Sequence, residues 1–170
     1  LHGNIEYTIS HPTSHIRGNT YNHDWYYTGD VTTDNTRWTT SEREKSIYDP
    51  CPVGWRVPDG GENGIWNVAE CENSAQYVGR GVYFDTQTPS ETWYPNSGFA
   101  NISGNFYGLA SGGGTSYYWS ASPCDSEENL VYCLYMSGRS EHSNLGYSCH
   151  VDPCAKLERG SKCVVRCQKE

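Results

Sequence analysis

The last third of the chain alternates short apolar or aromatic runs with long polar segments, and this pattern constrains the fold most strongly. The runs at 117–122, 130–136 and 163–167 contain mainly Tyr, Val, Leu and Cys, residue types that suit a pleated, half-buried strand. The segments at 123–129 and 137–162 are polar and show no periodicity. We therefore predict a sheet that carries long loops, and binding residues concentrate on loops that a rigid scaffold holds in place.

The length of 170 residues predicts one domain over 1–170, because a chain of this size can bury an adequate core alone. The core is expected to be aromatic, since the chain has 14 Tyr and 6 Trp but only 3 Phe and 1 Met. Frequent Gly and the lack of long amphipathic stretches favour a β-rich domain of the α+β class. In it, 1–46 would form N-terminal strands and loops, and 117–170 would form the C-terminal sheet with the candidate binding loops.

Further elements are expected before this sheet. Pro50 and Pro52 restrict the residues before them to extended conformations, which predicts a stiff ribbon leading into a strand at 55–57. A short helix is expected over 62–71, with Ile65, Trp66 and Ala69 on one face, and strands are expected at 79–84 and 92–95. Because each lies in a strand-like motif, three tryptophans are predicted to be largely buried: Trp55, Trp93 and Trp119.

The formal net charge of -8 argues against a nucleic-acid partner, because binding phosphates needs a basic surface. No apolar run approaches the roughly 20 residues of a membrane-spanning helix, so no membrane span is predicted. A metal site is not predicted either. His11 and His15 cannot stack on a helix across Pro12, and the acidic segment Asp125 to Asn129, which could offer oxygen ligands to calcium, is more simply a solvated turn.

The eight cysteines include no CxxC pair and no zinc-like spacing, so disulfides formed outside the cytoplasm explain them better than metal binding. If Cys163 and Cys167 share a strand, their Cα atoms lie about 13 Å apart at roughly 3.3 Å per residue. That separation exceeds the Cα reach of about 7 Å for a disulfide. The two cysteines therefore have different partners, or one of them is free.

Four motifs in a fixed order, at 48–58, 93–98, 118–123 and 165–167, resemble those of a known bacterial family. From about residue 47 to its end, the chain is similar to the Fibrobacter succinogenes major paralogous domain family. The resemblance implies a C-type-lectin-like fold of short twisted antiparallel sheets, one or two short helices and long loops. It also implies an extracellular location, on a bacterial cell surface or pilus tip, as part of a larger surface or pilus protein.

The family's usual cysteines match Cys51 and Cys167, and a bridge between them would tie together the two ends of the lectin-like part. Some proteins of this fold are variable proteins of diversity-generating retroelements, whose loop residues are diversified while frame residues stay fixed. Frame residues of that kind would be Tyr135, Val151, Pro153, Arg159 and 165–167. The additional cysteines fit diversified loops, and they fit equally well an ordinary domain with extra disulfides.

The resemblance implies a non-catalytic ligand-binding or adhesion module without a cofactor, whose ligand is an unknown protein or glycan at a cell or phage surface. Two alternatives stay open: an enzyme of the formylglycine-generating type, which shares the fold, and a structural subunit that caps a fibre without a ligand. The candidate ligand residues are polar or aromatic and lie on the C-terminal segments: Tyr117, Asp125, Glu127, Glu128, Arg139, Glu141, His142, Asn144, Tyr147, His150, Asp152, Lys156 and Glu158.

Overall fold

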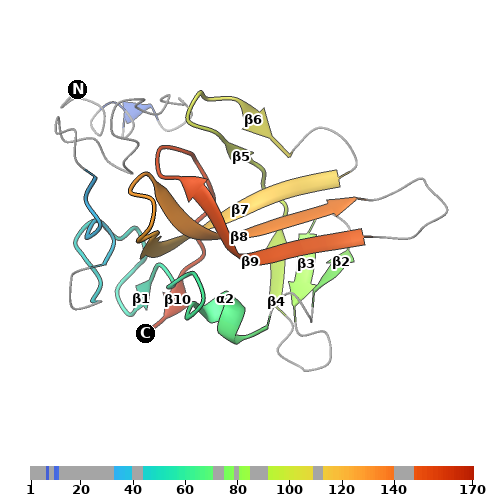
Figure 1. Cartoon of the computed structure of the whole chain (residues 1–170), viewed down its shortest axis with the longest axis horizontal. Helices are drawn as coiled ribbons and strands as arrows, with labels where there is room; N and C mark the ends of the chain where they lie inside the picture. Colours follow the sequence, from blue (N-terminus) through green and yellow to red (C-terminus); the bar gives the residue numbers. More distant parts are fainter. Residues whose placement is uncertain are drawn as a thin grey trace.

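A computed structural model describes residues 7, 10, 11, 33–39, 44–70, 75–78, 81–84, 92–108, 113–139 and 148–170. Most of the strands and loops expected before residue 46 lie outside these residues. In the part that is described, short antiparallel sheets dominate, and the helix that Figure 1 labels, α2, covers only Ile65–Val68. This composition of elements agrees with the predicted α+β class.

The largest sheet consists of the three long strands β7 (Gly113–Pro123), β8 (Leu130–Arg139) and β9 (Ser148–Glu158). They pair in the antiparallel order β7-β8-β9, and Figure 1 shows them side by side across the middle of the molecule. The predicted runs at 117–122 and 130–136 are confirmed as strands. The prediction of an irregular segment at 137–162 was wrong, because β8 continues to Arg139 and β9 covers eleven residues.

Three smaller sheets surround this one (Figure 1). A three-stranded sheet contains β2 (Gln76–Val78), β3 (Gly81–Phe84) and β4 (Thr92–Pro95), which confirms the strands expected at 79–84 and 92–95. The other two sheets are antiparallel pairs. They are formed by β5 (Phe99–Ala100) with β6 (Phe106–Tyr107), and by β1 (Trp55–Arg56) with β10 (Gln168–Lys169).

The two faces of the main sheet carry separate parts of the core. On one face, Tyr118, Leu134 and Met136 pack against α2 and the β2-β3-β4 sheet, and all three side chains are buried. On the other face, Trp119 and Cys133 pack against the segment after β9, which includes Cys163 and Val165. The predicted burial of Trp119 is confirmed, with 4% of its surface exposed.

The predicted burial of two other tryptophans was wrong, since Trp55 is 42% exposed and Trp93 is 41% exposed. Trp55 lies in a sheet of only two short strands. Trp93 lies on the outward side of β4, where its indole covers Gly81. The inward side of β4 is occupied by Tyr94, whose ring meets that of Tyr118 at 4.9 Å. Alternation along a strand therefore decided which aromatic residue enters the core.

The predicted helix is shorter than expected, and its apolar face is different. Trp66 is buried, whereas Ile65 and Ala69 are exposed. A helix of four residues makes about one turn, so it presents one side chain rather than a stripe to the core. That side chain is Trp66, which donates its indole N–H to the hydroxyl of Tyr94 at 3.2 Å.

The strand predicted at 163–167 was also wrong. Only Val164 pairs there, through a parallel bridge to Tyr118 along the free edge of β7. The inference that Cys163 and Cys167 do not pair with each other nevertheless holds. Cys167 is bridged to Cys51, with a Cα–Cα distance of 5.7 Å, which confirms the expected disulfide. Among the described cysteines, the free thiols are Cys124, Cys133, Cys149, Cys154 and Cys163.

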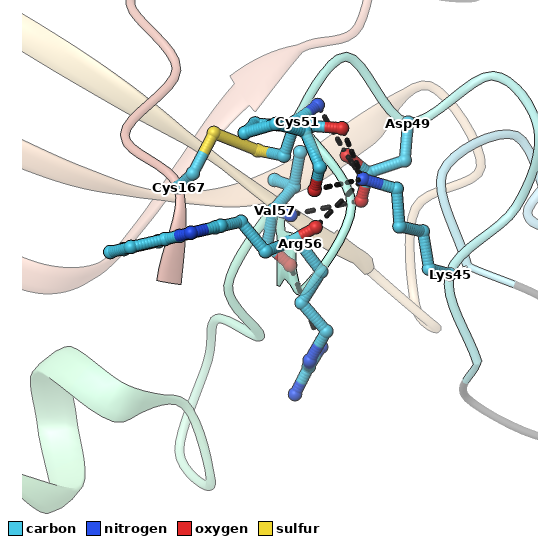
Figure 2. The surroundings of a disulfide bond; sticks show 8 residues. Lys45, Asp49, Cys51, Arg56, Val57 and Cys167 are labelled. Carbon is cyan, nitrogen blue, oxygen red and sulfur yellow. Dashed lines mark hydrogen bonds and ion pairs between the residues drawn. A yellow bond between two sulfur atoms is a disulfide. The ribbon is translucent and has the colours of Figure 1, made fainter. Parts of the chain in front are cut away.

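Two charged side chains brace the ribbon around this disulfide, as Figure 2 shows. The buried carboxylate of Asp49 accepts hydrogen bonds from the backbone amides of Cys51, at 2.7 Å, and Val57, at 2.9 Å. The ammonium group of Lys45 donates to the carbonyl oxygens of Cys51, Pro52 and Trp55 and lies 3.6 Å from the Asp49 carboxylate. Side-chain contacts from Lys45 and Asp49 therefore hold the ribbon that the prolines predicted.

Candidate ligand-binding face

A β-bulge in β9 determines which candidate residues share a face of the main sheet. Before the bulge, Asp152 pairs with Tyr135; after it, Ala155 pairs with Cys133. Three steps along β9 thus correspond to two steps along β8, so β9 contains one extra residue. Since side chains alternate between the faces of a strand, one extra residue exchanges the two faces for the rest of β9.

The candidate ligand residues of β9 therefore divide into two groups. His150 and Asp152 lie on the face that carries Tyr135, whereas Lys156 and Glu158 lie on the opposite face. All four belong to a strand, so the prediction that they lie in an irregular loop was wrong. The alternation of β9 was hard to recognise in the sequence because the bulge changes its phase near Pro153.

Five rings form a continuous row across the first of these faces. The contacts run from Tyr107 to Phe99 at 5.0 Å between ring centroids, on to Tyr117 at 4.7 Å, on to Tyr135 at 4.9 Å, and finally to His150 at 5.6 Å. We call this set the aromatic row. It connects β6, β5, β7, β8 and β9, so residues that are distant in sequence form one surface.

The two end rings of the aromatic row are exposed, and the three middle rings are partly buried. Tyr107 is 45% exposed and His150 is exposed, while Phe99, Tyr117 and Tyr135 are partly buried. Burial raises the pKa of Tyr117 to about 12, and the nearby ionisable groups, including Tyr135 and Asp152, contribute in the same direction. Its hydroxyl therefore stays neutral at physiological pH and can donate or accept a hydrogen bond.

Asp152 places a carboxylate at the β9 end of the aromatic row, directly across from Tyr135. The side chain is partly buried, and its Oδ1 atom accepts a hydrogen bond of 2.9 Å from the backbone amide of Cys154. Within the part of the chain that the structure describes, Asp152 makes no ion pair. The face therefore combines aromatic rings with a negative charge that no described cation neutralises.

The opposite face carries a different group near the turn between β7 and β8. Lys156 forms an ion pair of 3.2 Å with Glu127, and its ammonium lies 5.9 Å from the ring centroid of Tyr132. The thiol of Cys124 lies 3.3 Å from the hydroxyl oxygen of Ser126. Burial alone would raise the pKa of the Cys124 thiol, but hydrogen bonds from Ser126 and Lys156 outweigh burial and lower it.

The other candidate residues whose side chains are described do not join the aromatic row. Asp125, Glu127 and Glu128 are exposed in the turn that follows β7. Arg139 ends β8, and only its backbone is described. Four candidate residues lie outside the described residues: Glu141, His142, Asn144 and Tyr147.

Sequence reasoning missed three members of the aromatic row. Tyr135 was assigned to the frame, and Phe99 and Tyr107 were not considered as ligand residues. The only sequence signal was the presence of an aromatic residue in each of several short strands. That signal does not predict which rings meet, because the contacts depend on how β5 and β6 are placed beside β7.

Asn96, a polar residue that follows β4, has a structural role. It is buried, and its amide donates a hydrogen bond of 3.0 Å to the carbonyl oxygen of Gly114. Among the described residues, no group of three or more His, Cys, Asp and Glu side chains is arranged to hold a metal ion. Among the described residues, the aromatic row is the candidate ligand-binding surface.

The described helices include none that is long and apolar enough to cross a membrane. Comparisons of the chain with protein-family models, with curated proteins and with solved structures found no match.

Proposed function

We propose that this chain is a non-catalytic ligand-binding or adhesion module with a C-type-lectin-like fold, displayed on a bacterial cell surface or pilus tip. The aromatic row carries this proposal. Rings that are partly exposed, in contact with one another and fixed on a sheet provide contact area at a low cost in conformational entropy. The motifs at 48–58, 93–98, 118–123 and 165–167 support an assignment to the Fibrobacter succinogenes major paralogous domain family.

The support beneath the aromatic row favours a preorganised binding surface. Tyr118, Leu134 and Met136, which alternate with members of the row along β7 and β8, are at most 1% exposed. Their packing against the β2-β3-β4 sheet holds the strands in place. A ligand that binds the row therefore orders few residues, and little of the binding free energy is lost to ordering.

The burial pattern of β9 and the residues after it is compatible with diversification by a retroelement. Of the residues assigned to the frame, Val151, Pro153 and Arg159 are buried, whereas Tyr135 and 165–167 are partly buried. The neighbouring candidates His150 and Lys156 are exposed. Substitutions at exposed positions usually change stability by less than about 0.5 kcal/mol, so the exposed residues of β9 can vary without loss of the fold.

Binding arrays test the proposed function. The labelled chain is applied to glycan and bacterial-surface protein arrays, alongside the double variant Tyr107→Ser, His150→Ser, which removes the two exposed ends of the aromatic row. The matched control is Trp55→Ser, which removes an equally exposed ring that lies in β1, outside the row. We expect the double variant to lose the array signal, and the control to retain it, with similar thermal stability in both.

Two results would contradict the proposal. If the double variant binds its array ligand as strongly as the unmodified chain, the site lies elsewhere on the molecule. If the double variant unfolds, the ends of the row belong to the core rather than to a binding surface.

DNA sequences of sibling genes test the diversification separately, since differences should be confined to codons after Pro123.

A further inference from the structure

The carboxylate of Asp152 stands out because its charge is not balanced by any described residue. It is partly buried, it accepts one backbone hydrogen bond through Oδ1, and it has no other hydrogen bond or ion pair within the described ranges. Burial raises the pKa of the neighbouring thiols of Cys133 and Cys154, and the charge of Asp152 adds to this effect. A charge that is partly removed from water without a partner costs free energy, and a cation placed beside it would recover that cost.

The rings next to Asp152 add to this preference for a cation. Tyr135 lies directly across from it on β8, and His150 lies two residues earlier on the same face of β9. Side chains that are directly paired across antiparallel strands have Cβ atoms about 5 Å apart, so the ring and the carboxylate border one small area. The face of a tyrosine ring carries negative electrostatic potential and attracts cations.

Among biological cations, the guanidinium group fits this combination best. It is planar and stacks on aromatic rings, and its N–H groups also bind a carboxylate. An ammonium group would reach the carboxylate but stacks less well. A neutral sugar could cover the rings, but it would leave the charge of Asp152 unbalanced.

We propose that Asp152 and Tyr135, with the adjacent part of the aromatic row, form a subsite for an arginine side chain presented by a protein partner. This inference rests on the proposed function and names the chemical class of its ligand. The net charge of -8 acts in the same direction at longer range, since it favours encounters with a basic partner surface.

The test uses Nα-acetyl-arginine amide as the probe and Nα-acetyl-citrulline amide as its matched neutral analogue, which has the same shape without the charge. Each is titrated into the full chain while the NMR signals of Tyr135 and Asp152 are followed. We expect the arginine probe to shift both signals and the citrulline probe to bind about tenfold more weakly. That ratio corresponds to about 1.4 kcal/mol, near the lower end of the range for a hydrogen bond to a charged group.

Two variants separate the subsite from a general attraction to the acidic protein. Asp152→Asn removes the charge but retains an oxygen that can accept the Cys154 amide, so the fold is expected to persist and the preference for arginine over citrulline to disappear. Glu62→Gln removes one charge from an exposed side chain outside the subsite. We expect Glu62→Gln to keep the full preference.

Equal binding of the two probes, or an unchanged preference in Asp152→Asn, would overturn the arginine subsite. A third titration with methyl α-glucoside distinguishes the failure of this inference from that of the proposed function. If the glucoside shifts the signals of the row and the arginine probe does not, the ligand is a neutral sugar, and the proposed binding face stands. If no probe shifts them and array binding survives loss of Tyr107 and His150, both proposals fail.

Discussion

Removal of the Cys51–Cys167 disulfide should lower the stability of the chain by an amount that follows from the length of the loop it closes. The two cysteines are 116 residues apart in sequence. For such a loop, the chain-entropy relation gives a stabilisation of about 4.8 kcal/mol at room temperature. Because small domains are stable by only about 5–15 kcal/mol, the double variant Cys51→Ala, Cys167→Ala should lose a large part of its free energy of unfolding.

Urea unfolding measures this loss. With a slope of about 2 kcal/mol per molar urea, the midpoint of the double variant should lie about 2.4 M below that of the unmodified chain. Reductant provides the control, since it should bring the unmodified chain to nearly the same midpoint and leave the variant unchanged. Equal midpoints without reductant, or recovery of Cys51 and Cys167 as separate alkylated peptides, would refute the reasoning.

Three further predictions concern single side chains. Asp49→Ala should lower the free energy of unfolding by about 2–4 kcal/mol, because two buried amides lose their acceptor; Asp49→Asn, which keeps one acceptor oxygen, should lose less in the same denaturation experiment. Trp119→Ala should cost about 3–5 kcal/mol, and an unchanged urea midpoint would contradict its place in the core. The pKa of Tyr117 is raised to about 12 from its ordinary value of 10.0, so its contribution to stability is complete below pH 10 and is lost as the pH rises through 12. The pKa of Tyr117 is measured as the difference in tyrosinate absorbance between the unmodified chain and Tyr117→Phe during a pH titration. A pKa near the ordinary 10.0 would show that the ring is fully hydrated.

The elements that could be predicted from the sequence are those in which a single local signal dominates. Strands β7 and β8 contain continuous apolar and aromatic runs, and both were predicted. The strand β9 was missed because its buried residues, such as Val151, alternate with charged ones, and the bulge interrupts that alternation. The segment at 163–167 was mistaken for a strand because its residues are apolar, although they pack onto an existing sheet edge through one bridge at Val164.

The candidate site was predictable only in part, for a related reason. Tyr117, His150 and Asp152 were identified from residue type, and the structure brings them to one face. Their neighbours Phe99 and Tyr107 come from β5 and β6, and no local pattern predicts that this pair of strands lies against β7. Residue chemistry thus indicated the components, while the topology determined which of them meet.

The bulge in β9 connects the fold to the proposed chemistry of the site. In a regular strand Asp152 and Lys156 would point to the same face, because they are four residues apart. The extra residue between Asp152 and Ala155 instead directs Lys156 to the opposite face, where it pairs with Glu127 at 3.2 Å. The cation that could have neutralised Asp152 from the same strand is thereby removed, and the carboxylate beside Tyr135 stays available for a charged group from a partner.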